Sequence, residues 1–214
     1  YVFEARPWEL KKTESIDVMD AVGSNIRVDT YGWEVKRILP RINEDINEEW
    51  ISDKTRYSCD GLKNQRLDAP FVKDGNKFTK VSWKRAHEIL KSQVEKINYE
   101  KIGCLTGDLT NMETAFAAKE LFNKVFKSNL IDSRSKNYYV NFSEKQNYIF
   151  NSNITGIENS DLILMVGCNP RYEATLLNSR IRKSYLKSKL TIYSTNDIGD
   201  QTYPYKILDN STNL

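Results

Sequence analysis

The sequence has few of the features that mark a membrane span, a disulfide framework or a metal centre. Its longest apolar run extends only from Leu162 to Val166, far short of the ~18 residues that a transmembrane helix needs. It has 3 cysteines, Cys59, Cys104 and Cys168, which are far apart and form no C-x-x-C pair. We therefore expect free, partly buried thiols in a reducing compartment, and neither a disulfide framework nor a zinc site.

A strong excess of one charge is also absent. The chain has 32 basic and 29 acidic residues, and its formal net charge of +3 gives no case for a nucleic-acid surface. With 39% hydrophobic and 11% aromatic residues, the composition is typical of a globular protein rather than a disordered one. The 214 residues suffice for one or two domains with a hydrophobic core. The chain begins at Tyr1 without a methionine or a targeting segment, which indicates a trimmed or processed chain, or an N-terminal part that lies elsewhere.

The pattern over residues 1–80 predicts a small β-rich domain. Apolar and polar residues alternate over 26–30, Tyr31-Gly32 allows the chain to reverse, and 33–39 predicts the returning strand. Further on, Asp74-Gly75 between two short strand-like segments predicts a β-hairpin.

The pattern over residues 81–214 predicts an α/β domain with a parallel sheet. The apolar run at 161–166 is typical of a strand that is buried on both faces, as in parallel sheets. Strands alternate with helices, which favours right-handed crossovers. In chain order we expect a helix capped by Ser82, a strand at 102–105, a helix capped by Thr110 and Glu113, a strand at Leu130-Ile131, irregular structure over 132–153, the strand at 161–166, a helix over 173–186 and a strand at 190–193.

The turn from Val166 to Pro170 is the first place where a ligand could bind. It follows a predicted parallel strand and precedes a helix, and ligands of open α/β sheets bind beyond the carboxyl ends of the strands. A nucleotide or dinucleotide-like pocket is therefore one interpretation. The turn lacks G-x-G-x-x-G spacing, so we interpret it as a connecting turn and assign it no ligand.

Charged side chains offer further candidates, and we expect each group to be structural or solvated. The basic face of the last predicted helix could meet an acidic partner or a phosphate, but charge runs are mostly solvated: Arg180, Arg182, Lys183, Lys187 and Lys189. The paired acids are predicted to face solvent rather than to bind metal or to catalyse: Glu44, Asp45, Glu48 and Glu49. The single histidine, His87, is expected to be structural. No nucleophile–base pair is visible, and we assign no catalytic, cofactor-binding or metal-binding residue.

Several long blocks closely resemble one protein family. In the first part these blocks are Ala5 to Leu10, Lys12 to Ile26, Arg37 to Arg41, Glu44 to Arg56, Asp60 to Lys63 and Gln65 to Leu67. In the second part they are Asn147-Tyr148, Gly156 to Glu158, Asp161 to Val166, Asn169 to Ala174 and Asn178 to Ser184. Together they resemble the large iron–sulfur subunit of respiratory complex I, the proton-pumping NADH:ubiquinone oxidoreductase, in its mitochondrial and alphaproteobacterial form. The resemblance covers nearly the whole chain and is weakest over 128–145.

The resemblance implies that the cofactors of this family lie outside this chain. The family's N-terminal part binds one 2Fe–2S and two 4Fe–4S clusters, and its cysteine groups are absent here. The remaining part resembles molybdopterin-dependent oxidoreductases, whose small domain holds a further cysteine-bound cluster. Ser52 occupies the position of that cluster's last cysteine, no cysteine occurs from Tyr1 to Ser58, and Cys59 is displaced from the motif. The turn at 167–170 resembles the nucleotide-contacting loop of the pterin enzymes, but complex I relatives carry no pterin. We therefore expect no cofactor in this segment.

The fold and function that the resemblance implies can be stated together. Residues 1–80 would form a small domain like a degenerate 4Fe–4S domain, and residues 81–214 an α/β domain of the molybdopterin-oxidoreductase type, incomplete at its C-terminus. The segment would be non-catalytic and would support electron transfer from NADH to ubiquinone in the peripheral arm. The alternatives are a working molybdopterin or tungstopterin oxidoreductase fragment and an independent nucleotide-binding module.

The resemblance also implies partners and a location. The expected partners are the cluster-bearing part of the same subunit and neighbouring subunits of the peripheral arm, with no nucleic acid and no direct membrane span. The expected location is the matrix face of the mitochondrial inner membrane, or the cytoplasmic face of an alphaproteobacterial plasma membrane.

Overall fold

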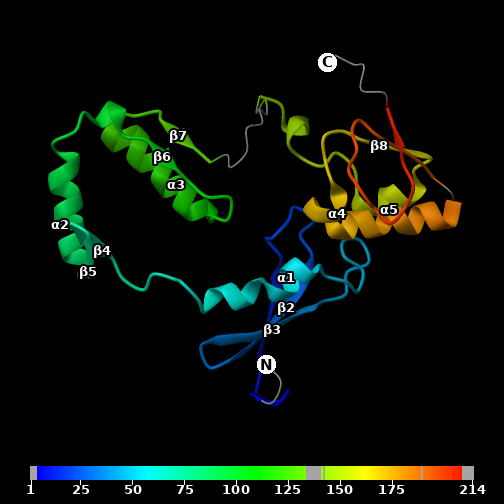
Figure 1. The fold of residues 1–214 in the computed structure, drawn as a ribbon, viewed down its shortest axis with the longest axis horizontal. Helices are drawn as coiled ribbons and strands as arrows, with labels where there is room; N and C mark the ends of the chain where they lie inside the picture. The colour runs from blue at the N-terminus through cyan, green and yellow to red at the C-terminus, as the bar shows by residue number, and fades with distance from the viewer. Residues whose placement is uncertain (1–3, 134–140, 142, 189, 209–214) are drawn as a thin grey trace. The chain divides into compact units, whose positions relative to one another are not determined.

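The structure, a computed structural model, describes residues 4–133, 141, 143–188 and 190–208 (Figure 1). The chain divides into two compact units, the first made of residues 1–64 and 143–214 and the second of residues 65–142. Antiparallel strands come first along the chain and parallel strands later, which confirms the predicted α/β class. The predicted domain boundary at residue 80 stays a prediction. Within the described residues, no helix is both long and apolar enough to cross a membrane.

The first unit begins with a three-stranded antiparallel sheet in the order β1-β2-β3. Its strands are β1 (Lys11–Ile16), β2 (Asn25–Tyr31) and β3 (Glu34–Pro40). The chain reverses after β2 at Gly32, whose φ of 57° lies in the left-handed region that glycine adopts at no steric cost. The reversal predicted at Tyr31-Gly32 is therefore confirmed.

A short helix packs beside this sheet and closes a small apolar core. Helix α1 (Asp53–Tyr57) and the 3-10 turn η1 (Ser58–Leu62) both contact β3. The buried members of the core come from the sheet, from the residues before α1 and from η1: Ile26, Ile38, Ile51 and Cys59. Cys59 is a free, buried thiol, and Cys104 and Cys168 are free and partly buried, as predicted for the thiols themselves.

The other part of the first unit is a parallel three-stranded sheet covered by a helix. Strands β8 (Leu162–Met165), β9 (Thr191–Ser194) and β10 (Lys206–Ile207) pair in the order β10-β9-β8. Helix α5 (Thr175–Ser188) connects β8 to β9. Its buried Ile181 packs against Met165 and Ile192 of the two strands. The predicted strands and the crossover helix between them are confirmed.

Strand β8 corrects the prediction of a strand buried on both faces. Ile163 and Met165 belong to the core under α5, but Leu162 is 56% exposed and Leu164 is 49% exposed. Successive side chains of a strand point to opposite faces, and α5 covers only one face of this sheet. The apolar run therefore marked a strand correctly, while the second face of β8 stays open among the described residues of this unit.

The helix predicted over 173–186 is confirmed as α5, and a separate short helix precedes it. Helix α4 (Pro170–Glu173) comes first, and Ala174 then leaves the helical region with φ −151° and ψ 67° before α5 begins. Pro170 stands at the start of α4, where its missing N–H costs nothing. Because of this break, the turn at 167–170 leads into the short helix α4 and not into α5.

The second unit opens with a hairpin and a capped helix, both as predicted. Strands β4 (Phe71–Asp74) and β5 (Lys77–Lys80) pair antiparallel, and Gly75 between them has a φ of 58°. Helix α2 (Trp83–Val94) follows. Its cap is Ser82, whose Oγ accepts a hydrogen bond from the Arg85 amide at 3.3 Å.

The rest of the second unit is a strand–helix–strand arrangement with a different cap from the one predicted. Strands β6 (Cys104–Leu105) and β7 (Ile131–Asp132) pair in parallel, and α3 (Met112–Glu120) lies between them in the chain. The cap of α3 is Asn111, whose side chain accepts from the Thr114 amide at 2.9 Å. The predicted cap Thr110 is wrong because its amide donates to the Gly107 carbonyl and so belongs to the preceding turn.

Short irregular elements complete the fold. The segment η3 (Leu121–Phe126) is a π-helical continuation of α3, which ends at Lys127 in the left-handed region. Three 3-10 turns were not predicted: η2 (Tyr99–Lys101), η4 (Lys145–Asn147) and η5 (Ile154–Asn159). Of the stretch predicted to be irregular, residues 134–140 and 142 lie outside the described residues.

Candidate functional site

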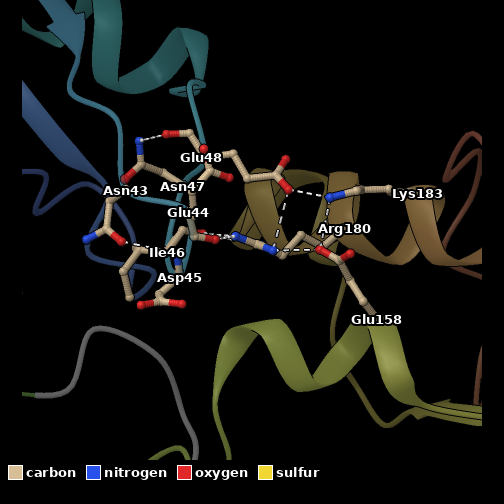
Figure 2. A network of polar contacts seen from close by, with 9 residues as sticks. All are labelled: Asn43, Glu44, Asp45, Ile46, Asn47, Glu48, Glu158, Arg180 and Lys183. Atoms are coloured by element: carbon tan, nitrogen blue, oxygen red, sulfur yellow. Dashed lines mark hydrogen bonds and ion pairs between the residues drawn. The ribbon is translucent and has the colours of Figure 1, made fainter.

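A buried arginine on α5 joins the two chain segments that make up the first unit (Figure 2). The Arg180 side chain is only 4% exposed. Its Nη2 donates to the backbone carbonyl oxygens of Glu44 and Ile46 at 2.5 and 3.2 Å. These carbonyls belong to the loop that follows β3, so the α5 side chain is bonded to the backbone of the β-rich part.

Two carboxylates compensate the charge of this arginine, and a lysine completes the group. Arg180 Nη1 lies 2.7 Å from Glu158 Oε1 and 3.6 Å from Glu48 Oε1. Lys183 Nζ lies 3.1 Å and 2.5 Å from the same two oxygens. We call Arg180, Glu158, Glu48 and Lys183 the Arg180 cluster. Two cations face two carboxylates in it, and this pairing offsets the cost of removing the guanidinium from water.

The electrostatic balance of the cluster is reflected in the pKa values of its members. Burial raises the pKa of Glu158, but hydrogen bonds from Lys183 and Arg180 outweigh burial and hold that pKa below its ordinary value. Hydrogen bonds to Glu48 and Glu158 raise the pKa of Lys183. Both shifts favour the charged forms of Glu158 and Lys183, which is the state in which the two side chains pair.

The loop that receives Arg180 is shaped by its own polar residues. The buried Asn47 side chain donates to the carbonyls of Arg41 and Trp50, both at 3.1 Å, and accepts from the Asn25 amide at 2.9 Å. Glu48 adopts a left-handed backbone conformation with φ 51°. The carbonyls that face Arg180 are therefore held in place before the arginine binds them.

The Arg180 cluster corrects the prediction of a solvated basic face on α5. Arg180 is buried, while Arg182 and Lys187 are exposed as predicted. Lys189 lies outside the described residues. A signal was present in the sequence, because Arg180 stands four residues after the buried Leu176 and therefore on the same face of the helix.

The acidic pairs before α1 are corrected in one position. Glu48 is partly buried and bound to Lys183, whereas Glu44, Asp45 and Glu49 are exposed as predicted. His87 is exposed on α2, where its ring lies 5.9 Å from that of Trp83. None of these residues meets a second candidate group in an arrangement that would support acid–base chemistry.

Ser52 lies in a second buried polar group, at the start of α1. Its Oγ accepts from the Thr55 amide at 3.1 Å and lies 2.8 Å from Thr55 Oγ1. Thr55 Oγ1 in turn donates to Asp17 Oδ2 at 2.9 Å. All three side chains are buried. We call this group the Asp17–Thr55–Ser52 network. Sequence reasoning did not find Asp17 or Thr55, because 38 residues separate them.

The network does not offer the ligands that an iron–sulfur cluster needs. Such a cluster takes about four soft ligands, which are normally cysteine thiolates. Cys59 is buried in the apolar core beside Ile26 and Ile38, and burial raises the pKa of its thiol. Nowhere in the described part of the chain do three or more His, Cys, Asp or Glu side chains form a group that could hold a metal ion.

The turn before α4 has its polar groups engaged within the protein. The Asn169 amide donates to Glu173 Oε2 at 3.2 Å, and the Arg171 amide donates to Gln201 Oε1 at 3.3 Å. Gly167 N donates to Thr195 Oγ1 at 3.3 Å. A phosphate at a helix N-terminus needs such amides, so the residues present do not fit a pterin nucleotide here. The absence of a ligand at this turn stays a prediction.

Comparison with known proteins identifies matching families over most of the chain. Residues 66–214 match the sequence model of the family described as "Molybdopterin oxidoreductase". Residues 10–60 match the family described as "NADH-ubiquinone oxidoreductase NDSU1/NuoG-like, 4Fe-4S domain". The two matched regions are separated by residues 61–65.

Similar curated proteins cover nearly all of the chain. The mitochondrial NADH-ubiquinone oxidoreductase 78 kDa subunit of Candida albicans is 50% identical over 206 residues, which are 95% of this chain and 29% of the relative. The same subunit of Neurospora crassa is 49% identical over 213 residues, which are 97% of this chain and 29% of the relative. An NADH-quinone oxidoreductase subunit of Rickettsia prowazekii is 42% identical over 214 residues, which are 100% of this chain and 32% of the relative. The chain thus spans about a third or less of the length of these relatives.

Proposed function

The chain belongs to the molybdopterin oxidoreductase family and, within it, to the large iron–sulfur subunit of NADH–ubiquinone oxidoreductase, and from this premise we propose that it is a non-catalytic structural segment of that subunit. The observation that carries the proposal is identity of 42% to 50% over nearly the whole chain, together with a Ser52 site that lacks cluster ligands. In this proposal the segment supports electron transfer from NADH to ubiquinone without taking up electrons.

The proposed contribution of the segment is rigidity. Electron tunnelling between clusters depends on fixed distances, so a support that holds its parts in one geometry favours transfer. The Arg180 cluster supports this role because a single buried side chain bonds α5 to the backbone of the loop after β3. A contact made of several bonds to backbone oxygens restrains the loop more strongly than an exposed ion pair would.

We also propose that this segment binds no cofactor of its own. Relatives and the second matched family indicate iron–sulfur clusters in the family as a whole. Within the segment, the proposal is supported by Ser52, which caps α1 with its hydroxyl, and by Cys59, which is buried in an apolar core.

Domain organisation, partners and location follow from the same premise. We propose a small β-rich domain over 1–80 and an α/β domain over 81–214, which the match of 66–214 to one family supports in its second part. The proposed partners are the cluster-bearing part of the subunit and neighbouring peripheral-arm subunits of complex I. The proposed location is the matrix face of the mitochondrial inner membrane, with the cytoplasmic face of an alphaproteobacterial membrane as the alternative, and the named mitochondrial and rickettsial relatives support both.

The test is to isolate the chain both alone and from its native assembly. An affinity-tagged chain is expected to co-migrate with NADH–ubiquinone oxidoreductase activity on a native gel. Purified alone, it should contain no stoichiometric iron, molybdenum or tungsten and should not oxidise NADH. Stoichiometric molybdenum or tungsten would instead support a working pterin enzyme, and a nucleotide-induced rise in melting temperature would support a nucleotide-binding module. Stoichiometric iron, or failure to co-migrate with the complex, would overturn the proposal.

A further inference from the structure

The Asp17–Thr55–Ser52 network lies in the region where the matched family would place a metal cluster. Residues 10–60 match a family described as a 4Fe-4S domain, yet no cysteine precedes Cys59, and the family resemblance implies that Ser52 occupies the position of the last ligand. Metal ligation in small domains supplies folding free energy, because the ligands are brought together only in the folded state. A domain of this family that lacks the ligands needs another source of that free energy.

We propose that the Asp17–Thr55–Ser52 network replaces the cluster as the cross-link between the segment 17–24 and the start of α1, so that this part of the chain folds without metal. The inference rests on the family membership stated above. It goes beyond the proposed function, because it names the side chains that do the structural work of the missing cluster.

The hydrogen bonds of the network have defined directions. Thr55 Oγ1 carries one proton, which it donates to Asp17 Oδ2 at 2.9 Å. The 2.8 Å contact between the two hydroxyls must then use the proton of Ser52. Ser52 Oγ also accepts from the Thr55 amide at 3.1 Å. Both hydroxyl protons are therefore used, and the bonds form an unbroken chain from the α1 cap to Asp17.

The segment that carries Asp17 is itself held by hydrogen bonds. The Asp17 amide donates to the Ser24 carbonyl at 2.8 Å, and Asp17 Oδ1 accepts from the Met19 amide at 3.2 Å. Asp20 accepts from the Val22 amide at 2.9 Å. The segment 17–24 is thus folded by its own side-chain and backbone bonds. A single connection at Asp17 is enough to fix this whole segment to α1.

All three side chains of the network, Asp17, Ser52 and Thr55, are buried, and so is Ser24 beside them. A buried carboxylate that loses a donor is costly, because no water takes the place of the lost hydrogen bond. The network is therefore cooperative: removal of one hydroxyl leaves the remaining buried polar groups without a hydrogen-bond partner, which is unfavourable.

The test uses urea unfolding of the full chain with and without a strong iron and zinc chelator. The chelator should leave the unfolding midpoint unchanged. Thr55→Val, which keeps the shape and removes the hydroxyl, should lower the midpoint, and so should Asp17→Ala, which removes the acceptor oxygens. The double variant should fall much less than the sum of the two single losses, because both remove the same bond. The matched control is Thr13→Val on the exposed face of β1, which should leave the midpoint unchanged.

Three results would overturn the proposal: a midpoint lowered by chelator, a Thr55→Val midpoint equal to that of Thr13→Val, or fully additive single losses. If the variants do not fold, hydrogen exchange of the wild-type chain decides the matter. The amides of Thr55 and Asp17 should exchange slowly, and exchange at the rate of unstructured peptides would contradict the network. Co-migration with the native complex plays no part in this test, so failure of the proposed scaffold function and failure of the network are distinguishable.

Discussion

Arg180 donates hydrogen bonds to three oxygens, two of them backbone carbonyls and one from Glu158, and forms a longer ion pair with Glu48. Each is within reach because the guanidinium is planar and carries its N–H groups in a fixed fork. A lysine at this position would keep the charge but could not bond the loop and Glu158 with the same geometry. The residue therefore acts through its shape as much as through its charge.

We expect Arg180→Met to destabilise the first unit by about 1–3 kcal/mol, because the carbonyls of Glu44 and Ile46 lose their donor while the two carboxylates keep Lys183 as a partner. The measurement is the urea midpoint of the full chain followed by far-UV circular dichroism. Lys187→Met is the control, since Lys187 is exposed on the same helix. Equal midpoints for the two variants would show that the buried contact contributes nothing. Arg180→Lys should recover only part of the loss.

Glu158 makes stability depend on pH in a defined direction. Its pKa in the folded chain lies below the ordinary value of 4.5. The unfolded chain therefore binds the proton more readily, and the stability contributed by Glu158 is present above pH 4.5 and is lost as the pH falls through the lower, folded-state pKa. Glu158→Gln should flatten the fall of the urea midpoint below about pH 5. A slope unchanged by Glu158→Gln would contradict this assignment.

At the scale of elements, the start of α3 shows which of two neighbouring residues does the capping. We expect Asn111→Ala to cost about 1 kcal/mol, because the amide of Thr114 loses its side-chain acceptor. Thr110→Ala is the matched control and should cost much less, since only the backbone of Thr110 is bonded to Gly107. Hydrogen exchange at the Thr114 amide reports the effect directly. Faster exchange in Thr110→Ala than in Asn111→Ala would restore the cap predicted from the sequence.

Local sequence signals predicted the elements well where one residue decides the geometry. Gly32 and Gly75 mark reversals because only a left-handed conformation closes them easily, and Ser82 caps α2 because its hydroxyl reaches the third amide of the helix. The signal fails at Thr110-Asn111 because two adjacent residues are both able to cap, and the preceding turn decides between them. Solvent exposure of the second face of β8 could not be predicted either, because the composition of a strand does not say which layers cover it.

At the scale of the whole molecule, the site depends on contacts that no local pattern contains. Arg180 bonds carbonyls that lie 134 and 136 residues earlier in the chain, and Thr55 bonds a carboxylate 38 residues away. Family resemblance indicated that Ser52 stands in place of a ligand, but not that its hydroxyl is bonded to Thr55. Sequence therefore drew attention to Ser52, and only the structure shows which side chains its hydroxyl contacts.

The open face of β8 has a consequence for the isolated chain. Leu162, Leu164 and Val166 are exposed at alternate positions of the chain, and exposed apolar side chains on one face of a strand promote binding of hydrophobic dyes and self-association. We expect Leu164→Glu to lower the fluorescence of a bound apolar dye and to leave the unfolding midpoint unchanged. Met165→Glu, on the covered face, should unfold the unit instead. A loss of stability in Leu164→Glu as large as in Met165→Glu would show that both faces are covered.

The loop after β3 contributes to Arg180 mainly through its backbone. Glu44 and Ile46 accept hydrogen bonds through their carbonyl oxygens, so their side chains do not determine the contact. When residues 44 and 46 are randomised, many variants should therefore keep the contact with Arg180 and fold normally. When residue 180 is randomised, almost only arginine should do so. One side of this contact therefore depends on a particular side chain, and the other depends only on the course of the backbone.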